Sequence, residues 1–340
     1  MTMTTEKASV TVSPTSSTIS APTTVKSSIL RFAGRYYLQL VLLAAVLVLA
    51  ATQPTFRSLF NIQNVLLQAS FAGLVACGMT LLISAGLFDL SVAGIIAVSG
   101  VAVATILPTT TIGIAIGAAV VIGALLGAVN GIVVTILHIP AFIATLGMLN
   151  IYLAIAFIWT QGRVVPISSS NFFAIGNGSL FFLPFAFLVF TAACFISHLL
   201  LHRTYFGRSL RAIGSSEQAA IMAGLPVVRV KIIAFTATGL FAGVAAVALS
   251  SLLSSANGTM ATGIELNAIA IAVVGGTALR GGQGTLLGTF TGALVFAVLA
   301  NALNILGVDA YWQYVSVGAV LVAALALGAL RKSSSVRGAE

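Results

Sequence analysis

Charged residues are what this sequence lacks most. Only 6% of its 340 residues are Asp, Glu, Lys or Arg, against roughly 25% in soluble globular domains. Hydrophobic residues make up 59% of the chain, and the mean hydropathy is +1.14. So few charges cannot cover a water-facing surface. The composition therefore excludes a soluble enzyme and a disordered protein, and it predicts an all-α polytopic membrane protein.

Motifs that carry chemistry are also few. The only two cysteines, Cys77 and Cys194, lie inside apolar runs and are expected to be packed thiols rather than a disulfide. The three histidines lack metal-ligand spacing, and no nucleophile–His–acid arrangement has supporting context. A G-x-x-x-x-G-K-[ST] phosphate loop is absent. We therefore expect no metal, no cofactor, no enzymatic activity and no ATP hydrolysis by this chain.

Apolar runs of about 20 residues, the length that crosses a bilayer, predict ten transmembrane spans. The spans are expected at 36–53, 65–84, 89–107, 112–137, 141–160, 180–201, 230–253, 265–279, 285–307 and 312–330. Residues 1–30 are expected to be a disordered tail, since Ser and Thr fill 15 of the first 28 positions. Residues 31–332 would form the transmembrane domain and 333–340 a second tail. The first span resembles a signal peptide, but the long polar tail favours a retained span.

Basic residues predict the orientation in the membrane. The net charge is +9, and the cations lie in short segments between apolar runs, which favours an orientation signal over nucleic-acid binding. With ten spans, 13 of the 15 cations fall on one side, five of them in a loop at 202–231, whereas Arg57 and Arg163 fall on the other. Both termini are therefore expected in the cytoplasm.

Two features recur five spans apart and predict an inverted repeat of spans 2–5 and 7–10. Asp89 opens the third span, and Glu265 opens the eighth. Glycines four residues apart, which let helix backbones approach closely, occur in the fourth span and around the ninth. Ordinary packing would explain one such ladder, but a second one five spans later favours a repeat. The two ladders are Gly123, Gly127 and Gly131, and Gly284, Gly288 and Gly292.

Polar residues near or inside the spans are candidates for the transport pathway or its gate. An acid flanked by apolar spans is costly, and Asp89 and Glu265 could each cap a helix or carry a proton. The asparagines could instead form hydrogen bonds between helices. The candidates are Asp89, Ser91, Asn130, Glu265, Asn267 and Asn301.

The loop at 202–231 is predicted to contain a short helix. Ser215 at the N-cap and Gln218 three residues later read as a capping box, with a helix over 216–223. Gly224 would follow its end and Pro226 would stop it. Such a helix is either an inert surface element or a docking site for a cytoplasmic partner.

At these segments the sequence resembles the membrane permeases of ribose-type ABC importers, over about residues 61–330. Each motif is weak alone, but their order along the chain is specific. The resembling segments are Asp89–Val92, Asn130-Gly131, Ile139–Gly147, Gly207-Arg208, Ala212–Gly214, Ala219-Ala220, Gly224, Glu265–Ala270, Gly275–Thr277, Gly281–Gly284 and Asn301–Asn304. The chain departs from the family at Ala85–Phe88, where paired glycines are usual, and at Ala93.

The resemblance implies a type II ABC-importer fold in the bacterial inner membrane. It implies two permease copies, identical or not, two ATPase subunits or one tandem ATPase that bind the ATP, and a periplasmic or lipid-anchored binding protein. The solute would be a pentose, hexose or polyol. The implied ATPase-coupling residues are Arg208, Arg211, Ser215, Glu217, Gln218, Ala219, Ala220 and Gly224.

Two other functions compete with this interpretation. An ion-coupled secondary transporter would use Asp89 or Glu265 as the ion carrier and also suits an inverted repeat. A membrane scaffold that transports nothing would not need matching glycine ladders.

Overall fold

The computed structural model describes residues 37–309, 311–312, 315, 318–319 and 322. Contacts between residues divide the chain into two compact units, residues 1–37 and residues 38–340. Apart from Tyr37, the first residue of helix α2, every described residue belongs to the second unit. The tails expected at 1–30 and 333–340, and most of the span expected at 312–330, lie outside the described residues.

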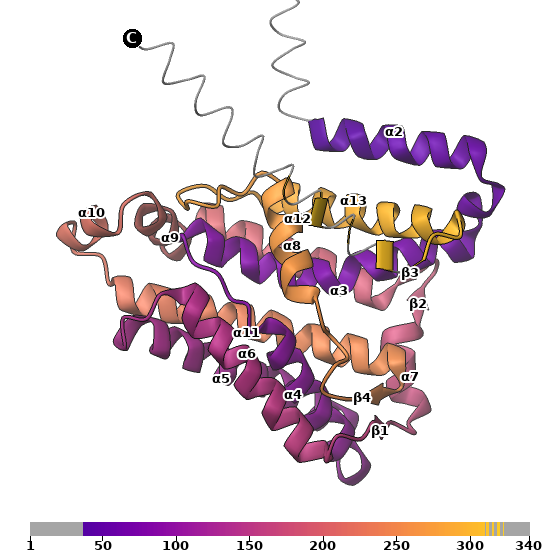
Figure 1. The fold of residues 1–340 in the computed structure, drawn as a ribbon, viewed down its shortest axis with the longest axis horizontal. Coiled ribbons are helices and arrows are strands. Elements are labelled where there is room, and N and C mark those ends of the chain that lie inside the picture. The colour runs from indigo at the N-terminus through magenta and orange to yellow at the C-terminus, as the bar shows by residue number, and fades with distance from the viewer. Residues whose placement is uncertain (1–36, 310, 313–314, 316–317, 320–321, 323–340) are drawn as a thin grey trace, which may run out of the picture. The chain divides into compact units, whose positions relative to one another are not determined.

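Seven helices of the described part are long and apolar enough to cross a membrane. They are α3 (Leu59–Ser84), α4 (Val92–Ile106) with the 3₁₀ turn η2 (Leu107–Thr109), α5 (Ile112–Ile136), α6 (Ala141–Thr160), α8 (Phe185–Arg203), α11 (Val227–Leu253) and α13 (Leu286–Ile305) (Figure 1). Each overlaps a predicted span. A long apolar run becomes a helix because, in lipid, the backbone N–H and C=O groups must be satisfied within the segment.

Two further predicted spans form shorter helices. The run at 36–53 gives the 16-residue α2 (Tyr37–Thr52), and the run at 265–279 gives the 11-residue α12 (Ile264–Val274). At 1.5 Å per residue α12 is about 17 Å long, against about 30 Å for the hydrocarbon core. It stops because Gly276 has a φ of 92° and the N–H groups of Gly276 and Thr277 turn back to helix carbonyls. The helix therefore begins where the span was predicted but ends at Val274 and not at residue 279.

The remaining elements connect the long helices. They are η1 (Pro54–Arg57), α7 (Ser170–Asn177), α9 (Tyr205–Ser215), α10 (Glu217–Met222), and the strands β1 (Val165–Pro166), β2 (Ser179–Leu180), β3 (Leu183–Pro184) and β4 (Ser255–Ala256). β1 pairs antiparallel with β4, and β2 pairs antiparallel with β3. The β2–β3 hairpin explains why α8 begins at Phe185 and not at residue 180 as predicted.

The long helix α11 contacts α5, α3, α4 and α7 and joins the two ends of this unit. The segments α9 and α10 lie near its N-terminus, and α7, β1 and β4 lie near its C-terminus (Figure 1). Buried residues dominate α3 and α4, including Cys77, which like Cys194 of α8 is a buried free thiol as predicted. Most of α5 and α6 instead presents apolar side chains outward, as expected of helices that face lipid.

Glycines bring α5 and α11 into backbone contact. A Cβ atom at Gly127 would lie 3.0 Å from Cα of Gly239, and one at Gly131 would lie 2.8 Å from Cα of Ile232. A Cβ atom at Gly123 would likewise meet the backbone of Gly239 and Gly243. These distances leave no room for a larger side chain, so this ladder sets the separation of the two helices.

The second glycine ladder differs from the prediction. Helix α13 begins after its N-cap Thr285, so Gly284 precedes the helix and only Gly288 and Gly292 lie on it. Gly288 approaches the carbonyl group of Gly275, and a Cβ at Gly292 would lie 2.7 Å from the carbonyl oxygen of Ile271. The prediction of three glycines on one helix face was therefore wrong, because a turn at 275–284 separates Gly284 from the helix.

Candidate functional site

The short helix α10 follows α9 after a single residue. The side chain of Ser216 accepts a hydrogen bond from the N–H of Ala219 (3.3 Å), so Ser216 is the N-cap. Ser215 instead ends α9, and its hydroxyl donates to the carbonyl of Arg211 (2.9 Å). The predicted capping box was therefore wrong by one residue: of two adjacent serines, the first continues α9 and the second starts α10.

The predicted end of α10 matches the structure. Gly224 has a φ of 74°, and its N–H donates to the carbonyl of Ile221 (2.9 Å). The N–H of Leu225 donates to the carbonyl of Ala220 (3.0 Å). This is the two-bond closure in which a glycine in the left-handed region follows the last helical turn. Pro226 then precedes α11, so the reversal between the two helices is fixed locally.

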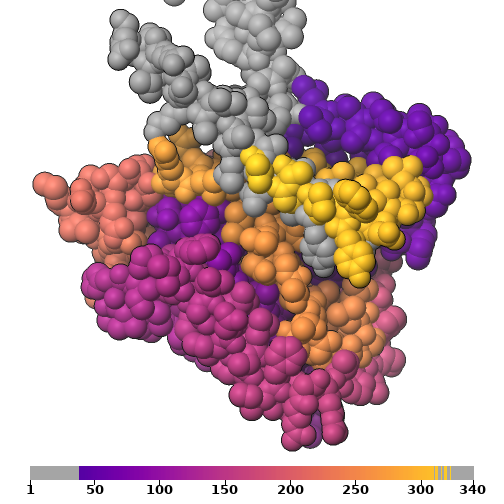
Figure 2. Space-filling view, viewed as in Figure 1, coloured from indigo at the N-terminus to yellow at the C-terminus, as the bar shows by residue number. Residues whose placement is uncertain are grey.

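Helix α10 presents an apolar tip to its surroundings. Ala220 packs inward and is 3% exposed, whereas Met222 is 89% and Ile221 57% exposed. Gln218 and Ala219 are exposed as well. Figure 2 shows the residues of this region, coloured salmon, as a projection at the edge of the described unit. Sequence reasoning missed Ile221 and Met222, although large apolar residues in an otherwise polar, cationic loop were a usable signal.

The two arginines proposed for coupling lie on α9. Arg208 is exposed, and Arg211 is half-buried with its Nε donating to the carbonyl of Gly207 (3.4 Å). The α9 helix is held against α8, where Gly207 packs on the backbone of Leu200 and Leu201. Its other end meets the glycine-rich turn after α12, since Gly214 packs against Gly281 and Gly282.

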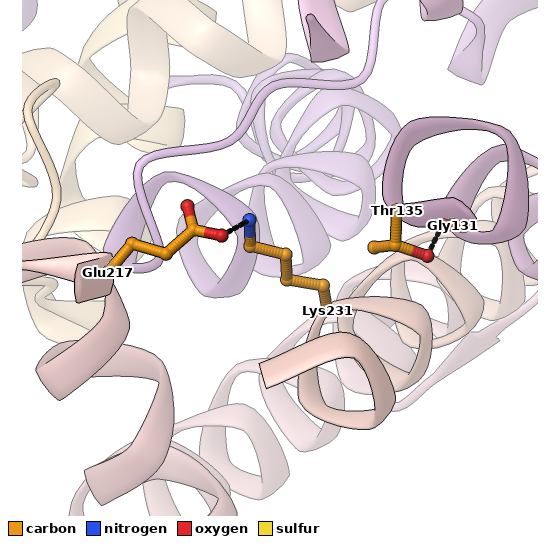
Figure 3. Close-up of polar contacts among 4 residues, drawn as sticks. All are labelled: Gly131, Thr135, Glu217 and Lys231. Atoms are coloured by element: carbon orange, nitrogen blue, oxygen red, sulfur yellow. Dashed lines mark hydrogen bonds and ion pairs between the residues drawn. The ribbon is translucent and has the colours of Figure 1, made fainter. Parts of the chain in front are cut away.

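An ion pair joins α10 to α11. Nζ of Lys231 lies 2.6 Å from Oε1 of Glu217, and the Lys231 side chain is only 11% exposed (Figure 3). It is the one ion pair within the described ranges of the chain. Both residues were placed in the predicted loop, but their pairing depends on the turn at 223–226, which the sequence pattern does not specify.

A cavity of about 770 Å³ lies beside this ion pair. Its walls come from α10 and the start of α11 on one side, and from the end of α5 and the turn into α6 on the other. Thr135, whose hydroxyl donates to the carbonyl of Gly131 (2.7 Å), lines the cavity together with Glu217 and Lys231 (Figure 3). On this side, α10 is therefore separated from α5 by open space.

Three of the predicted pathway residues meet in one buried network. Asp89 accepts hydrogen bonds from the N–H (2.8 Å) and the hydroxyl (2.7 Å) of Ser91, and from the amide of Asn130 on α5 (3.0 Å). The hydroxyl of Tyr152 on α6 donates to Asn130 (3.0 Å). All four side chains are almost completely buried. The network ties the turn between α3 and α4 to α5 and α6, and Tyr152 was not singled out by the sequence.

Asp89 is not the N-cap residue of α4, which was one of its two predicted roles. The N-cap position belongs to Ser91, and no side chain accepts from the first turn there. Asp89 lies two residues earlier and fixes Ser91 through a local turn. The N-cap residue of α12 is Gly263 and Glu265 lies in the first turn, where its carboxylate accepts hydrogen bonds from the backbone N–H groups of Gly263 and Glu265, so the alternative in which Glu265 caps the helix is supported in part.

The other pathway candidates lie apart from this network. Asn301 on α13 exchanges two hydrogen bonds with Asn61 on α3 (3.0 and 2.7 Å), both residues being buried. Asn267 is half-buried, and one carboxylate oxygen of Glu265 is buried with no hydrogen-bond partner among the described residues. Within the same part of the chain, no three His, Cys, Asp or Glu side chains gather into a possible metal site.

Comparisons with known proteins place the chain in a family of transport proteins. Residues 61–325 match the family model described as branched-chain amino acid transport system / permease component. The chain is 38% identical over 291 residues to the L-arabinose transport system permease protein AraH of Escherichia coli, covering 85% of this chain and 89% of that one. It is 37% identical over 300 residues to the ribose import permease protein RbsC of Bacillus subtilis, covering 85% and 90%. No solved structure matches the chain.

Proposed function

This chain belongs to the family of branched-chain amino acid transport system permease components, and we propose that it is the membrane-spanning subunit of an ATP-driven sugar importer. The relatives named for arabinose and ribose favour a pentose as solute. The observation that carries the proposal is α10, a short exposed helix that lies between α9 and α11 and contacts both. The chain itself has no phosphate loop with which to bind ATP. ATP is then bound and hydrolysed by a partner.

The tip of α10 is the proposed docking site for the ATPase subunits. Exposed apolar side chains such as Met222 and Ile221 are the type that anchors an interface when a partner offers a pocket. Gln218 and Ala219 supply the polar and small positions around them. Ala220 faces inward and would support the helix rather than touch the partner.

The charge distribution supports a cytoplasmic location for α10. Five cations lie between residues 203 and 231, at the α9–α10 end, whereas Arg163 follows the opposite end of α6. Positive residues concentrate on the cytoplasmic side of membrane proteins. With α10 in the cytoplasm, the strands β1–β4 and α7 would face the side from which a binding protein delivers the sugar.

The helix contacts support an inverted repeat that pairs α3, α4 and α5 with α11, α12 and α13. Under this correspondence, each contact in one half should have a counterpart. The α5–α11 contact has its counterpart in α13–α3, and the α4–α11 contact in α12–α3. Repeats of this kind place the transport pathway near their interface, and a second permease copy would complete it.

The enclosed Asp89 network argues against an ion carrier at that position. All of its oxygens have partners, and none of its members reaches the surface of this chain. A carboxylate that binds and releases protons during transport needs access to water from each side in turn. Asp89 is better explained as the hydrogen-bond acceptor that fixes the turn between α3 and α4.

Uptake of labelled sugars tests the proposed function. Cells that lack the gene and complemented cells would receive a panel of pentoses, hexoses and polyols, with ATP depletion and an uncoupler as separate arms. We expect pentose uptake that stops on ATP depletion and survives the uncoupler while ATP is maintained. Uptake that collapses with the uncoupler at constant ATP would contradict the proposal and favour an ion-coupled transporter.

A further inference from the structure

Helix α10 has two routes by which a displacement could reach the membrane helices. The first runs through α9, whose end is pinned by Gly214 against the turn at 281–282. The N–H of Gly282 in turn donates to the carbonyl of Ser84 at the end of α3 (2.9 Å). The second route runs to α11, across the turn at 223–226 and the ion pair between Glu217 and Lys231.

A third route, by direct packing of α10 against the turn between α5 and α6, is interrupted by the cavity. Close-packed side chains transmit a displacement because they cannot be compressed. Between α10 and the α5–α6 turn, however, the structure has about 770 Å³ of open space, bordered by Ile221 on one side and His138 on the other. A push on α10 toward α5 is therefore not passed on by contact in that direction. The connection from α10 to this half of the unit runs through α11.

The ion pair is built to act as a firm connection. Glu217 is the first residue of α10, and Lys231 lies in the second turn of α11, 14 residues later in the chain. The Lys231 side chain is 11% exposed and the Glu217 side chain 50% exposed, so the lysine is packed into the structure while its partner on α10 faces the cavity and the surface. A charge-assisted hydrogen bond of this kind is short and directional. It joins the first residue of α10 to the second turn of α11 beside the cavity.

Helix α11 can carry that displacement to distant parts of the unit. Its 27 residues extend for about 40 Å. Gly239 meets the glycine ladder of α5, so α11 and α5 cannot shift independently without losing their close contact. At the far end, the hydroxyl of Ser251 accepts a hydrogen bond from the N–H of Gly176 on α7 (2.7 Å). One rigid helix thus joins the α10 end to the opposite end.

We propose that the Glu217–Lys231 ion pair is the link that couples movement of α10 to movement of α11 during transport. This inference rests on the proposed function, in which the ATPase moves α10. Both residues are positioning residues, because neither needs to touch the sugar or the nucleotide. Breaking the link is expected to leave ATP hydrolysis running while less sugar is moved for each ATP.

The test uses the full importer, with its ATPase and binding protein, reconstituted in proteoliposomes. The variants are Glu217→Gln, Lys231→Gln, the double variant, and the charge exchange Glu217→Lys/Lys231→Glu. The matched control is Arg229→Gln, which removes an exposed cation of the same α11 turn region that forms no ion pair in the described structure. Two quantities are measured: sugar transported per ATP hydrolysed, and the amount of ATPase that copurifies with the permease.

We expect each single variant to lower the sugar-to-ATP ratio about fivefold or more, the lower range of typical coupling between sites. The double variant should be no worse than either single one, since both remove the same interaction. The charge exchange should recover most of the ratio, and Arg229→Gln should match the wild type. ATPase copurification should remain normal in all of them.

Two results would overturn the proposal. One is an unchanged ratio in both single variants. The other is loss of ATPase copurification in Glu217→Gln, with no recovery in the charge exchange, which would make Glu217 a direct contact of the ATPase. Failure of the proposed function is visible separately, because the wild-type importer itself would then show no ATP-dependent transport.

Discussion

At the scale of single residues, buried polar side chains form hydrogen bonds that join the turn between α3 and α4 to helices α5 and α6. Asp89 satisfies three donors with two oxygens, and Asn130 passes the network on to Tyr152. Polar groups that would be costly inside an apolar bundle are compensated partly within the local turn, by Ser91, and partly by a partner from another helix, as in the Asn130–Tyr152 bond. The sequence identified Asp89, Ser91 and Asn130 as important, but it could not show that they meet, because their partners are up to 41 residues away.

Replacing Asp89 by Asn tests its role at the residue scale. The new amide would direct a donor at the donor amide of Asn130, so one buried hydrogen bond is lost and two donors oppose each other. We expect a loss of about 1–3 kcal/mol in stability, read as a lower melting temperature of the purified protein in detergent. Ser99→Ala is the control, because the Ser99 hydroxyl is buried without a hydrogen-bond partner in the described structure.

The uptake assay separates this structural role from proton transport. If Asp89 only fixes the turn, residual uptake should fall in step with the amount of folded Asp89→Asn protein. A variant that keeps the wild-type melting temperature but transports nothing would contradict the structural role and point to an ion carrier.

At the scale of elements, glycine content decides which helices can approach. Helices α5 and α11 touch through Gly127 and Gly239, whereas Gly117 on the same α5 helix faces open space. The sequence shows both positions as glycines in one apolar run. Whether such a glycine is needed for close packing depends on whether another helix lies against it, which the sequence of α5 alone does not show.

Substitutions on α5 test this packing. Gly127→Ala places a Cβ against the backbone of α11, and we expect it to destabilise the protein by about 1–3 kcal/mol. Gly117→Ala adds the same methyl group where the structure leaves room, so its melting temperature should equal or slightly exceed that of the wild type. Equal effects of the two substitutions would show that the α5–α11 contact is not as close as described.

The tip of α10 gives a second prediction at this scale. Met222→Glu should leave membrane insertion intact but weaken ATPase binding by about 2 kcal/mol or more, roughly 30-fold in Kd. Phe181→Glu is the control, since Phe181 is 92% exposed in the β2–β3 turn, away from α10. Pull-down of the ATPase by the detergent-solubilised permease measures both. Normal ATPase binding by Met222→Glu would remove α10 from the interface.

Sequence patterns predicted the long elements better than their ends. Apolar runs located all seven long helices because length and hydropathy alone determine a membrane span. The same reasoning extended the span at 265–279 through Gly275 and Gly276, where hydropathy stays high but the backbone turns. It also started α8 too early, because a two-residue hairpin leaves no periodic signal. Local turns were thus the main source of error.

At the scale of the whole molecule, the described unit has a central helix that connects two different ends. Helix α11 begins beside the exposed α10 and finishes beside α7 and β4. Helix α11 packs along α5, and α13 packs along α3. This arrangement suits a permease in which an event at one end must change packing along the full length.

Transport by the reconstituted importer tests the central claim most directly. Permease, cognate ATPase and binding protein would be placed in proteoliposomes with ATP enclosed on the side of α10 and labelled pentose outside. We predict that sugar accumulates inside only with hydrolysable ATP, and that a proton or Na⁺ gradient does not replace it. Accumulation driven by an ion gradient in the absence of ATP would contradict the account.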